Sequence, residues 1–166
     1  KPDKSNVESI LKSINLAVDL VKKKQVMAIV TNPISKDIIS LKNKNFSGHT
    51  EYLQKKDKSK SCAMMMINNY SKIIPLTIHL PLKDVSKNIN SKTIKNVATV
   101  INHSLKKDFR IQKPKIAVSG LNPHSGDGGL LGVEEKKIIY PMIVKLRTQK
   151  IDINGPFAAD SLFRKH

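Results

Sequence analysis

The sequence of 166 residues predicts an α/β fold. Short runs of apolar, often β-branched residues alternate with longer stretches whose apolar residues recur at helical spacing. Strands that alternate with helices are typical of a mixed or mainly parallel sheet covered by helices. The length suits a single domain with a substantial core, and no repeat or low-complexity linker marks an internal boundary.

Five stretches are predicted to form helices. The first begins at Ser5, because Ser5 and Glu8 have the spacing of a capping box, and its apolar face continues to Val21. A short helix is expected over Ser35–Leu41. Further helices are expected after the loop Ser47–Thr50, over Ile94–Leu105, and from Glu134, the last kinked at Pro141, which lacks an N–H donor.

Short apolar runs bounded by turn residues are predicted to form strands. A polar turn at Asn68–Ser71 is expected to join two of them, and the three methionines 64–66 are expected in the strand core. The predicted strands are Val26–Val30, Cys62–Ile67, Ile73–His79, Lys115–Ser119 and Ile151–Ile153.

The chain is strongly basic, with a formal net charge of +17. Such a charge is typical of nucleic-acid-binding proteins. However, 27 of the 30 basic residues are lysine and only three are arginine, the side chain that pairs with phosphates and guanine in a bidentate way. Lysine, isoleucine and asparagine, all encoded by A/T-rich codons, make up 60 of the 166 residues. Coding bias therefore explains the lysines at least as well, and we do not expect nucleic-acid binding.

The cellular setting follows from what the chain lacks. Cys62 is the single cysteine, so no internal disulfide can form, and a reducing compartment is expected. No apolar run approaches the roughly 20 residues that span a bilayer, and no signal peptide is recognisable. We therefore expect a cytoplasmic protein that does not enter the membrane.

Four places are candidates for chemistry, because α/β sheets bind ligands beyond the carboxyl ends of their strands. These are Thr31–Lys36, His49–Thr50, His79 and the loop Gly120–Gly132, which contains His124. Five glycines in that loop would let the backbone approach a ligand closely. The loop matches neither a dinucleotide-binding fingerprint nor a phosphate-binding P-loop, so it is a weak nucleotide signal.

Each candidate side chain also has an ordinary structural explanation. His79 and His124 could bind a divalent metal together, or each could be a lone polar residue bonded to backbone. His49 and Thr50 could simply cap a helix, and Asp160 could be an N-cap rather than a catalytic acid. His103, within an amphipathic helix, is expected to be solvated surface.

Several motifs occur together in a specific order. They are Gly48-His-Thr-Glu51, Thr77-Ile-His-Leu-Pro-Leu82, Gly120-Leu-Asn-Pro-His-Ser-Gly-Asp-Gly-Gly129 and Gly155-Pro-Phe-Ala-Ala-Asp-Ser-Leu-Phe163. In this order they resemble the 4-hydroxythreonine-4-phosphate dehydrogenase family of pyridoxal phosphate biosynthesis. Thr31-Asn-Pro-Ile-Ser-Lys36 is similar to that family's Thr-Ala-Pro-Val-Asn-Lys segment.

The resemblance implies NAD- or NADP-dependent oxidation of a phosphorylated hydroxy-amino acid, followed by loss of carbon dioxide. It implies a divalent metal (zinc, magnesium, cobalt or manganese) held by three histidines, of which His79 looks like the first and His124 like the second. His49 and Thr50 look like substrate-binding residues, and Asp160 looks like an active-site carboxylate. The implied fold is the two-domain, three-layer α/β/α architecture of the isocitrate/isopropylmalate dehydrogenase type, with the site shared across a homodimer.

The departures from the family matter as well. Family members are roughly twice as long, and the Tyr-His-Asp-Gln segment that supplies the third metal histidine is not found. Residues 1–166 are therefore expected to be the central part of the enzyme, inactive alone. Three alternatives stay open: a dehydrogenase of threonate or erythronate phosphate, a non-catalytic basic binding module, and a non-catalytic partner subunit.

Overall fold

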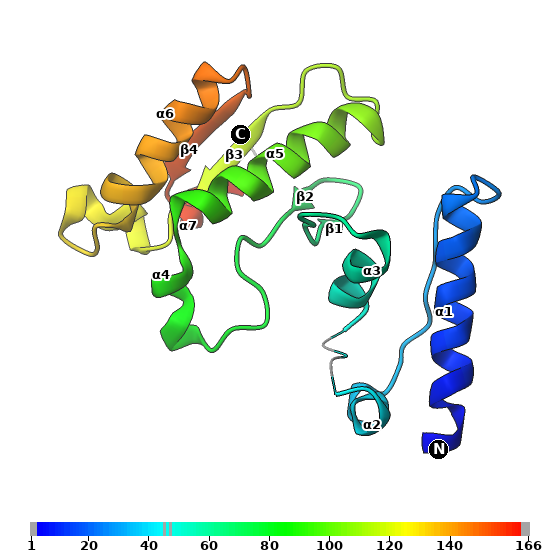
Figure 1. Ribbon diagram of the computed structural model, residues 1–166. Coiled ribbons are helices and arrows are strands. Elements are labelled where there is room, and N and C mark those ends of the chain that lie inside the picture. The colour runs from blue at the N-terminus through cyan, green and yellow to red at the C-terminus, as the bar shows by residue number, and fades with distance from the viewer. Residues whose placement is uncertain (1–2, 45, 47, 164–166) are drawn as a thin grey trace. The chain divides into compact units, whose positions relative to one another are not determined.

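The computed structural model describes residues 3–44, 46 and 48–163. These residues form two compact units, Lys1–Cys62 (unit 1) and Ala63–His166 (unit 2), and each is described by itself. Figure 1 shows unit 1 in blue to cyan and unit 2 from cyan to red. No linker composition marks the change at residue 62, which is why the sequence predicts no boundary there.

Unit 1 is helical in its described part. Its core contains Val7, Ile39 and Phe46, and the ring of Tyr52 lies 5.3 Å from that of Phe46, centroid to centroid. The Tyr52 hydroxyl donates a hydrogen bond to Asn15, 2.8 Å away. The elements are η1 (Lys4–Asn6), α1 (Val7–Lys22), α2 (Lys36–Lys42) and α3 (His49–Asp57), which confirms the three helices predicted in this region.

The first helix begins differently from the prediction, and the capping box is wrong. The side chain of Asp3 accepts a hydrogen bond from the N–H of Ser5 at 2.8 Å, which caps the short helix η1. Glu8 pairs instead with Lys12, one turn further along, with 2.8 Å between the charged atoms. Asp3 thus accepts from the Ser5 N–H, the free backbone donor that a capping box would pair with the side chain of Glu8.

The predicted strand Val26–Val30 is also wrong. This segment forms neither helix nor strand, and Met27 is 100% and Val30 97% exposed. A strand is not a local structure, because its N–H and C=O groups need a neighbouring strand. The described residues of unit 1 contain no second strand, so the apolar run has nothing to pair with.

Unit 2 contains all the described strands. They are β1 (Met66–Ile67), β2 (Lys72–Ile73), β3 (Ile116–Ser119) and β4 (Ile153–Phe157). Its helices are η2 (Leu82–Asp84), α4 (Val85–Asn88), α5 (Ser91–Lys107), η3 (Pro123–Gly129), η4 (Glu135–Ile139), α6 (Tyr140–Thr148) and α7 (Ala159–Leu162).

The parallel pair β3–β4 is the centre of unit 2. Ile116 pairs with Ile153, and η4 and α6 connect the two strands, which makes a βαβ unit (Figure 1). Buried side chains of α5 and α6 share one core with β4, and Ile143 and Leu146 there are 0% exposed. The α/β class is confirmed, and so is the predicted strand 115–119, which forms as Ile116–Ser119. The strand predicted at 151–153 is misplaced, because only Ile153 of it belongs to β4, which continues to Phe157.

The strands predicted at 62–67 and 73–79 are mostly wrong. Only Met66–Ile67 and Lys72–Ile73 pair, as an antiparallel hairpin across the predicted turn. The turn is confirmed, since Asn68 Oδ1 accepts hydrogen bonds from the N–H groups of Tyr70 and Ser71, both at 2.8 Å. Met66 is 51% exposed, and none of the three methionines is buried, so their placement in a strand core is wrong.

The helix predicted from Glu134 is interrupted, but not by a simple kink at Pro141. A π turn, η4, precedes α6, and the N–H of Tyr140 reaches back to the carbonyl of Glu135. Such wide turns occur where the regular ladder cannot continue, and Pro141 lacks an N–H donor. No helix in the described part of the chain is long and apolar enough to cross a membrane.

Candidate functional site

Unit 1 contains a cavity of about 630 Å³ at two of the predicted sites. Its lining includes His49 and the segment Thr31–Ser35, together with one face of α1. The size falls in the range of small-molecule pockets, roughly 300–1,000 Å³. Polar side chains around it include Asn6, Ser9 and Asn32. The structure therefore brings His49 and the Thr31 segment, 18 residues apart in sequence, to one cavity with a mixed polar and apolar lining.

His49 has an unsatisfied polar atom. Its Nε2 is shielded from solvent and has no hydrogen-bond partner among the described residues. Buried polar atoms in proteins are nearly always bonded, so an unpaired one indicates a group that is completed by something else. His49 is the first residue of α3, and neither it nor Thr50 makes a side-chain cap, since Gly48 is the N-cap. Thr50 is half-buried and is not among the cavity-lining residues.

Gly48 of the Gly-His-Thr-Glu motif sits where a side chain would have little room. A Cβ added there would lie 3.0 Å from a carboxylate oxygen of Glu51 and 3.3 Å from the ammonium of Lys36. The absence of a side chain lets these two groups approach the start of α3. Lys36, the last residue of the Thr31–Lys36 segment, is thereby placed at the His49 motif.

In unit 2 the glycine-rich loop follows β3, and α7 follows β4. Both segments leave the carboxyl ends of paired strands, which is where α/β sheets bind ligands. His124 Nδ1 lies 3.8 Å from Asp160 Oδ2, and the two side chains are 64% and 58% exposed. The N-cap of α7 is Ala158, so the N-cap interpretation of Asp160 is wrong. The structure brings the imidazole and the carboxylate together.

Backbone strain concentrates in the predicted site segments. Eight described residues other than glycine have a positive φ. Half of them follow the ends of helices, where a left-handed residue is a common terminator: Lys24, Lys58, Arg110 and Lys150. The other half are His79 (57°), His124 (48°), Ser125 (57°) and Asp127 (42°). A residue other than glycine with a positive φ costs conformational energy, and such residues are often found at functional sites. Both candidate metal histidines are among them.

His79 is exposed in unit 2, and a complete metal site is not formed by the described residues. They contain no group of three or more His, Cys, Asp or Glu side chains placed to hold a metal ion. Imidazole and carboxylate are suitable donors for zinc, cobalt or manganese, so His124 and Asp160 fit a divalent metal as a partial donor set. His103 is exposed on α5, which confirms its prediction as surface.

Sequence reasoning missed Glu135. Its carboxylate is 4% exposed and accepts hydrogen bonds from the backbone of the glycine-rich loop. The sequence offered a signal, since two adjacent acidic residues, Glu134 and Glu135, come one residue after a loop with five glycines whose N–H groups need acceptors.

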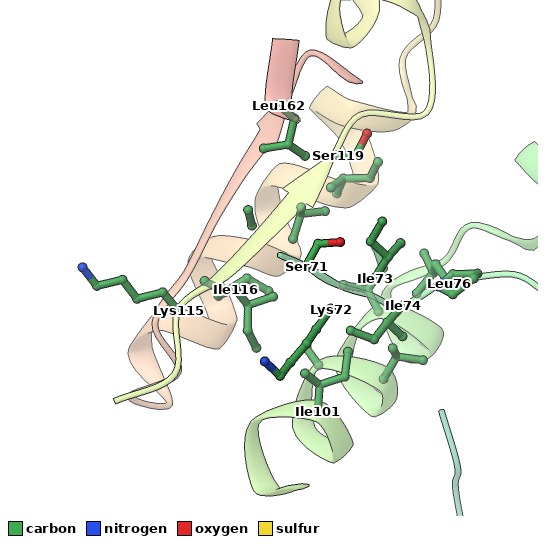
Figure 2. A pocket seen from close by; sticks show the side chains of 18 of the residues that line it. Ser71, Lys72, Ile73, Ile74, Leu76, Ile101, Lys115, Ile116, Ser119 and Leu162 are labelled. Atoms are coloured by element: carbon green, nitrogen blue, oxygen red, sulfur yellow. The ribbon is translucent and has the colours of Figure 1, made fainter. Parts of the chain in front are cut away.

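Unit 2 also has an apolar groove of about 700 Å³, lined by β3, α5 and the segment Tyr70–Thr77 (Figure 2). Figure 2 shows Ile73, Ile101 and Ile116 gathered around it, while Lys115 extends away. The lining is mostly aliphatic, and small-molecule sites need a few convergent polar groups to fix the ligand's orientation. The groove is therefore a poorer candidate than the cavity in unit 1, although Lys72, Lys115 and Ser119 also line it.

A βαβ unit with an imidazole and a carboxylate meeting beyond its strand ends defines an α/β protein with an enzyme-like site. The family model for the pyridoxal phosphate biosynthetic protein PdxA matches residues 1–166, and the chain belongs to that family. The 4-hydroxythreonine-4-phosphate dehydrogenase of Neisseria meningitidis serogroup A is 40% identical over 167 residues, covering 99% of this chain and 51% of the relative. A relative of the same name from Methylorubrum extorquens is 35% identical, with 99% and 48% covered.

Solved structures also match this chain. The crystal structure of 4-hydroxythreonine-4-phosphate dehydrogenase from Klebsiella pneumoniae matches with a TM-score of 0.91 at 29% identity, covering 98% of this chain and 49% of that one. A terephthalate 1,2-cis-dihydrodiol dehydrogenase from Burkholderia xenovorans shares the fold at 22% identity and a TM-score of 0.73. The chain thus spans about half the length of the curated relatives it matches.

Proposed function

We propose that this chain forms part of a 4-hydroxythreonine-4-phosphate dehydrogenase. The observation that carries the proposal is the approach of His124 to Asp160 beyond the ends of β3 and β4, in a chain whose relatives bear that enzyme's name. The chain spans about half of those relatives, so the proposed activity belongs to a protein that also contains the remaining half of the family fold.

The proposed reaction has two steps. The carbon that bears the substrate's hydroxyl transfers a hydride to the nicotinamide ring of NAD⁺ or NADP⁺, and the hydroxyl proton is released to a base or solvent, which leaves a ketone. The keto acid then loses its carboxylate as carbon dioxide, and protonation of the resulting carbanion gives 3-amino-2-oxopropyl phosphate.

In this chain, His49 and Thr50 are proposed to hold the polar end of the substrate. The unsatisfied Nε2 of His49 supports this role, because a bound substrate oxygen would complete it. The cavity of about 630 Å³ beside it has room for a four-carbon phosphorylated acid.

His79 and His124 are proposed as two of the metal ligands. The carboxylate of Asp160 beside His124 supports this role, because imidazole and carboxylate together are suitable donors for a divalent metal. A divalent metal at these donors would act as a Lewis acid that polarises substrate oxygens. The remaining donors would come from outside the described residues, and a homodimer with a shared site and a cytoplasmic location are part of the same proposal.

The test is a chimaera in which this chain replaces the matching half of the Neisseria relative. The expected result is oxidation of 4-hydroxythreonine-4-phosphate with NAD⁺ or NADP⁺, dependent on added Mg²⁺, Zn²⁺, Co²⁺ or Mn²⁺. His79→Ala and His124→Ala should each abolish turnover, whereas His103→Ala, an exposed histidine on α5, should leave it unchanged. Full activity in either of the first two variants would refute their role.

The same chimaera separates the related substrates. Threonate 4-phosphate and erythronate 4-phosphate differ from the proposed substrate in the group beside the carboxylate, a hydroxyl in place of an amine. A higher kcat/KM for either would assign the chain to a dehydrogenase of that acid.

A further inference from the structure

Glu135 is the one charged side chain that is buried among the residues the structure describes, at 4% exposure. Its position is the first residue of the π turn η4, directly behind the glycine-rich loop that carries His124. Burying a carboxylate costs free energy unless hydrogen bonds compensate for the lost water. The hydrogen-bond partners of Glu135 therefore indicate its role.

The partners of Glu135 all belong to the start of the loop. One carboxylate oxygen accepts hydrogen bonds from the N–H groups of Leu121 and Asn122, both at 2.7 Å. The other accepts one from the side-chain amide of Asn122 at 2.9 Å. Burial raises the pKa of Glu135, but these hydrogen bonds outweigh it and hold the pKa below its usual value. The group is therefore a fixed anion at neutral pH.

The loop that it holds has an unusual backbone. Five consecutive residues, 124–128, have positive φ between 42° and 82°, which makes a short left-handed turn. His124, Ser125 and Asp127 are not glycine, and each such residue costs roughly 1–2 kcal/mol in this region. A turn of this kind forms only where the surroundings hold it, because the isolated chain prefers other conformations.

Glycines pack closely around the bonded pair of Glu135 and Asn122. A Cβ on Gly126 would lie 2.9 Å from the Glu135 carboxylate, and a Cβ on Gly132 would lie 2.3 Å from the Asn122 amide. The loop therefore closes over these two side chains. The first residue of the loop is also tied to β4, since the N–H of Gly120 donates to the carbonyl of Phe157 at 2.8 Å.

We propose that Glu135 is a positioning residue for His124: by holding the backbone of Leu121 and Asn122 it fixes the left-handed turn that directs the His124 imidazole to Asp160. The importance of this geometry for catalysis rests on the proposed function. The positioning of His124 by Glu135 is independent of the proposed function.

The test uses NMR spectroscopy of the 166-residue chain with Glu135→Gln. Glutamine keeps the shape but replaces one acceptor oxygen by an NH₂ donor that opposes the Asn122 amide. The expected result is exchange of the Leu121 and Asn122 amide hydrogens that is at least about tenfold faster. The chemical shifts of residues 124–128 should change, and the Overhauser contact between His124 and the Asp160 side chain should weaken.

The matched control is Ile143→Val, a 0%-exposed core residue on α6 that makes no hydrogen bond to the loop. It destabilises unit 2 without touching the carboxylate. Wild-type shifts and protected amides in Glu135→Gln would overturn the proposal. So would the same loop changes in Ile143→Val at an equal loss of thermal stability, because Glu135 would then be merely structural.

Two further measurements distinguish a failure of the positioning role from a failure of the proposed function. If Glu135→Gln does not fold, Glu135→Asp keeps the charge but draws the carboxylate back by one methylene from the Leu121 and Asn122 N–H groups. It should still speed exchange of these two amides and alter the His124 shifts; unaltered exchange and shifts would overturn the proposal. Co²⁺ alone, titrated into the wild type, tests the function separately. No broadening of His124 there would refute the metal role, while the exchange data would still decide the positioning role.

Discussion

Glu135 and Asn122 are joined by two hydrogen bonds, one from the backbone N–H of Asn122 at 2.7 Å and one from its side-chain amide at 2.9 Å. This pair connects the first residue of η4 to the loop after β3. It explains how a loop with five glycines has one defined conformation. The candidate site in unit 2 thus depends on a buried carboxylate outside the motifs that the sequence displays.

Gly132→Ala should destabilise the chain by about 2–4 kcal/mol. The added Cβ would lie 2.3 Å from the Asn122 amide, and the φ of 140° is unfavourable for alanine. Gly128→Ala is the matched control, since its Cβ meets nothing within 4 Å and only the φ of 66° is strained. It should cost about 1 kcal/mol. Chemical denaturation measures both, and equal losses would contradict the close packing around Asn122.

The stability contributed by Glu135 should depend on pH. Its folded pKa lies below the usual value of 4.5, so its contribution is fully present above that pH and is lost as the pH falls through the lowered pKa. Glu135→Gln should cost about 2–3 kcal/mol at pH 7. The gap between the two proteins should shrink in acid, as followed by urea unfolding between about pH 7 and pH 3. A gap that is independent of pH would show that the carboxylate charge contributes nothing.

Leu146→Ala should lower the free energy of unfolding by about 2–5 kcal/mol, because it leaves a cavity in the core of unit 2, where Leu146 is 0% exposed. Leu130→Ala removes the same atoms from a side chain that is 88% exposed and should change stability by less than about 0.5 kcal/mol. Thermal or urea unfolding distinguishes them, and a small effect of Leu146→Ala would place the core elsewhere.

Met27→Lys should leave the stability of the chain within about 0.5 kcal/mol of the wild type. Met27 is fully exposed, so a lysine there loses no packing. A buried strand at 26–30, as the apolar pattern predicts, would instead make this charge cost several kcal/mol, because an unpaired ion would enter the core. Circular dichroism with urea titration is sufficient to decide.

The sequence predicts helices better than strands in this chain, for a physical reason. Helices such as α5 carry their own hydrogen bonds and show their apolar face at a fixed spacing, so Ile94 to Leu105 could be assigned from the pattern alone. Val26–Val30 has the composition of a strand, but pairing depends on a neighbour that the described part of unit 1 does not contain.

The residues of the candidate site that lie in recognisable motifs could be predicted from the sequence. His124 and Asp160 follow predicted strands, and their approach to 3.8 Å follows from the parallel pairing of β3 and β4. The unsatisfied Nε2 of His49 and the role of Glu135 were not predictable, because both depend on what lies around the side chain in space. How His79 takes part is a proposal that the motif supports.

We propose that His79 and His124 bind one divalent metal, and a Co²⁺ titration followed by the imidazole signals of the ¹⁵N-labelled chain tests this most directly. Weak binding is sufficient, because paramagnetic broadening reports low occupancy. The signals of His79 and His124 should broaden together at low Co²⁺. The signal of His103, exposed on α5, should broaden only at a much higher Co²⁺ concentration. Equal broadening of all three, or broadening of His103 first, would contradict it.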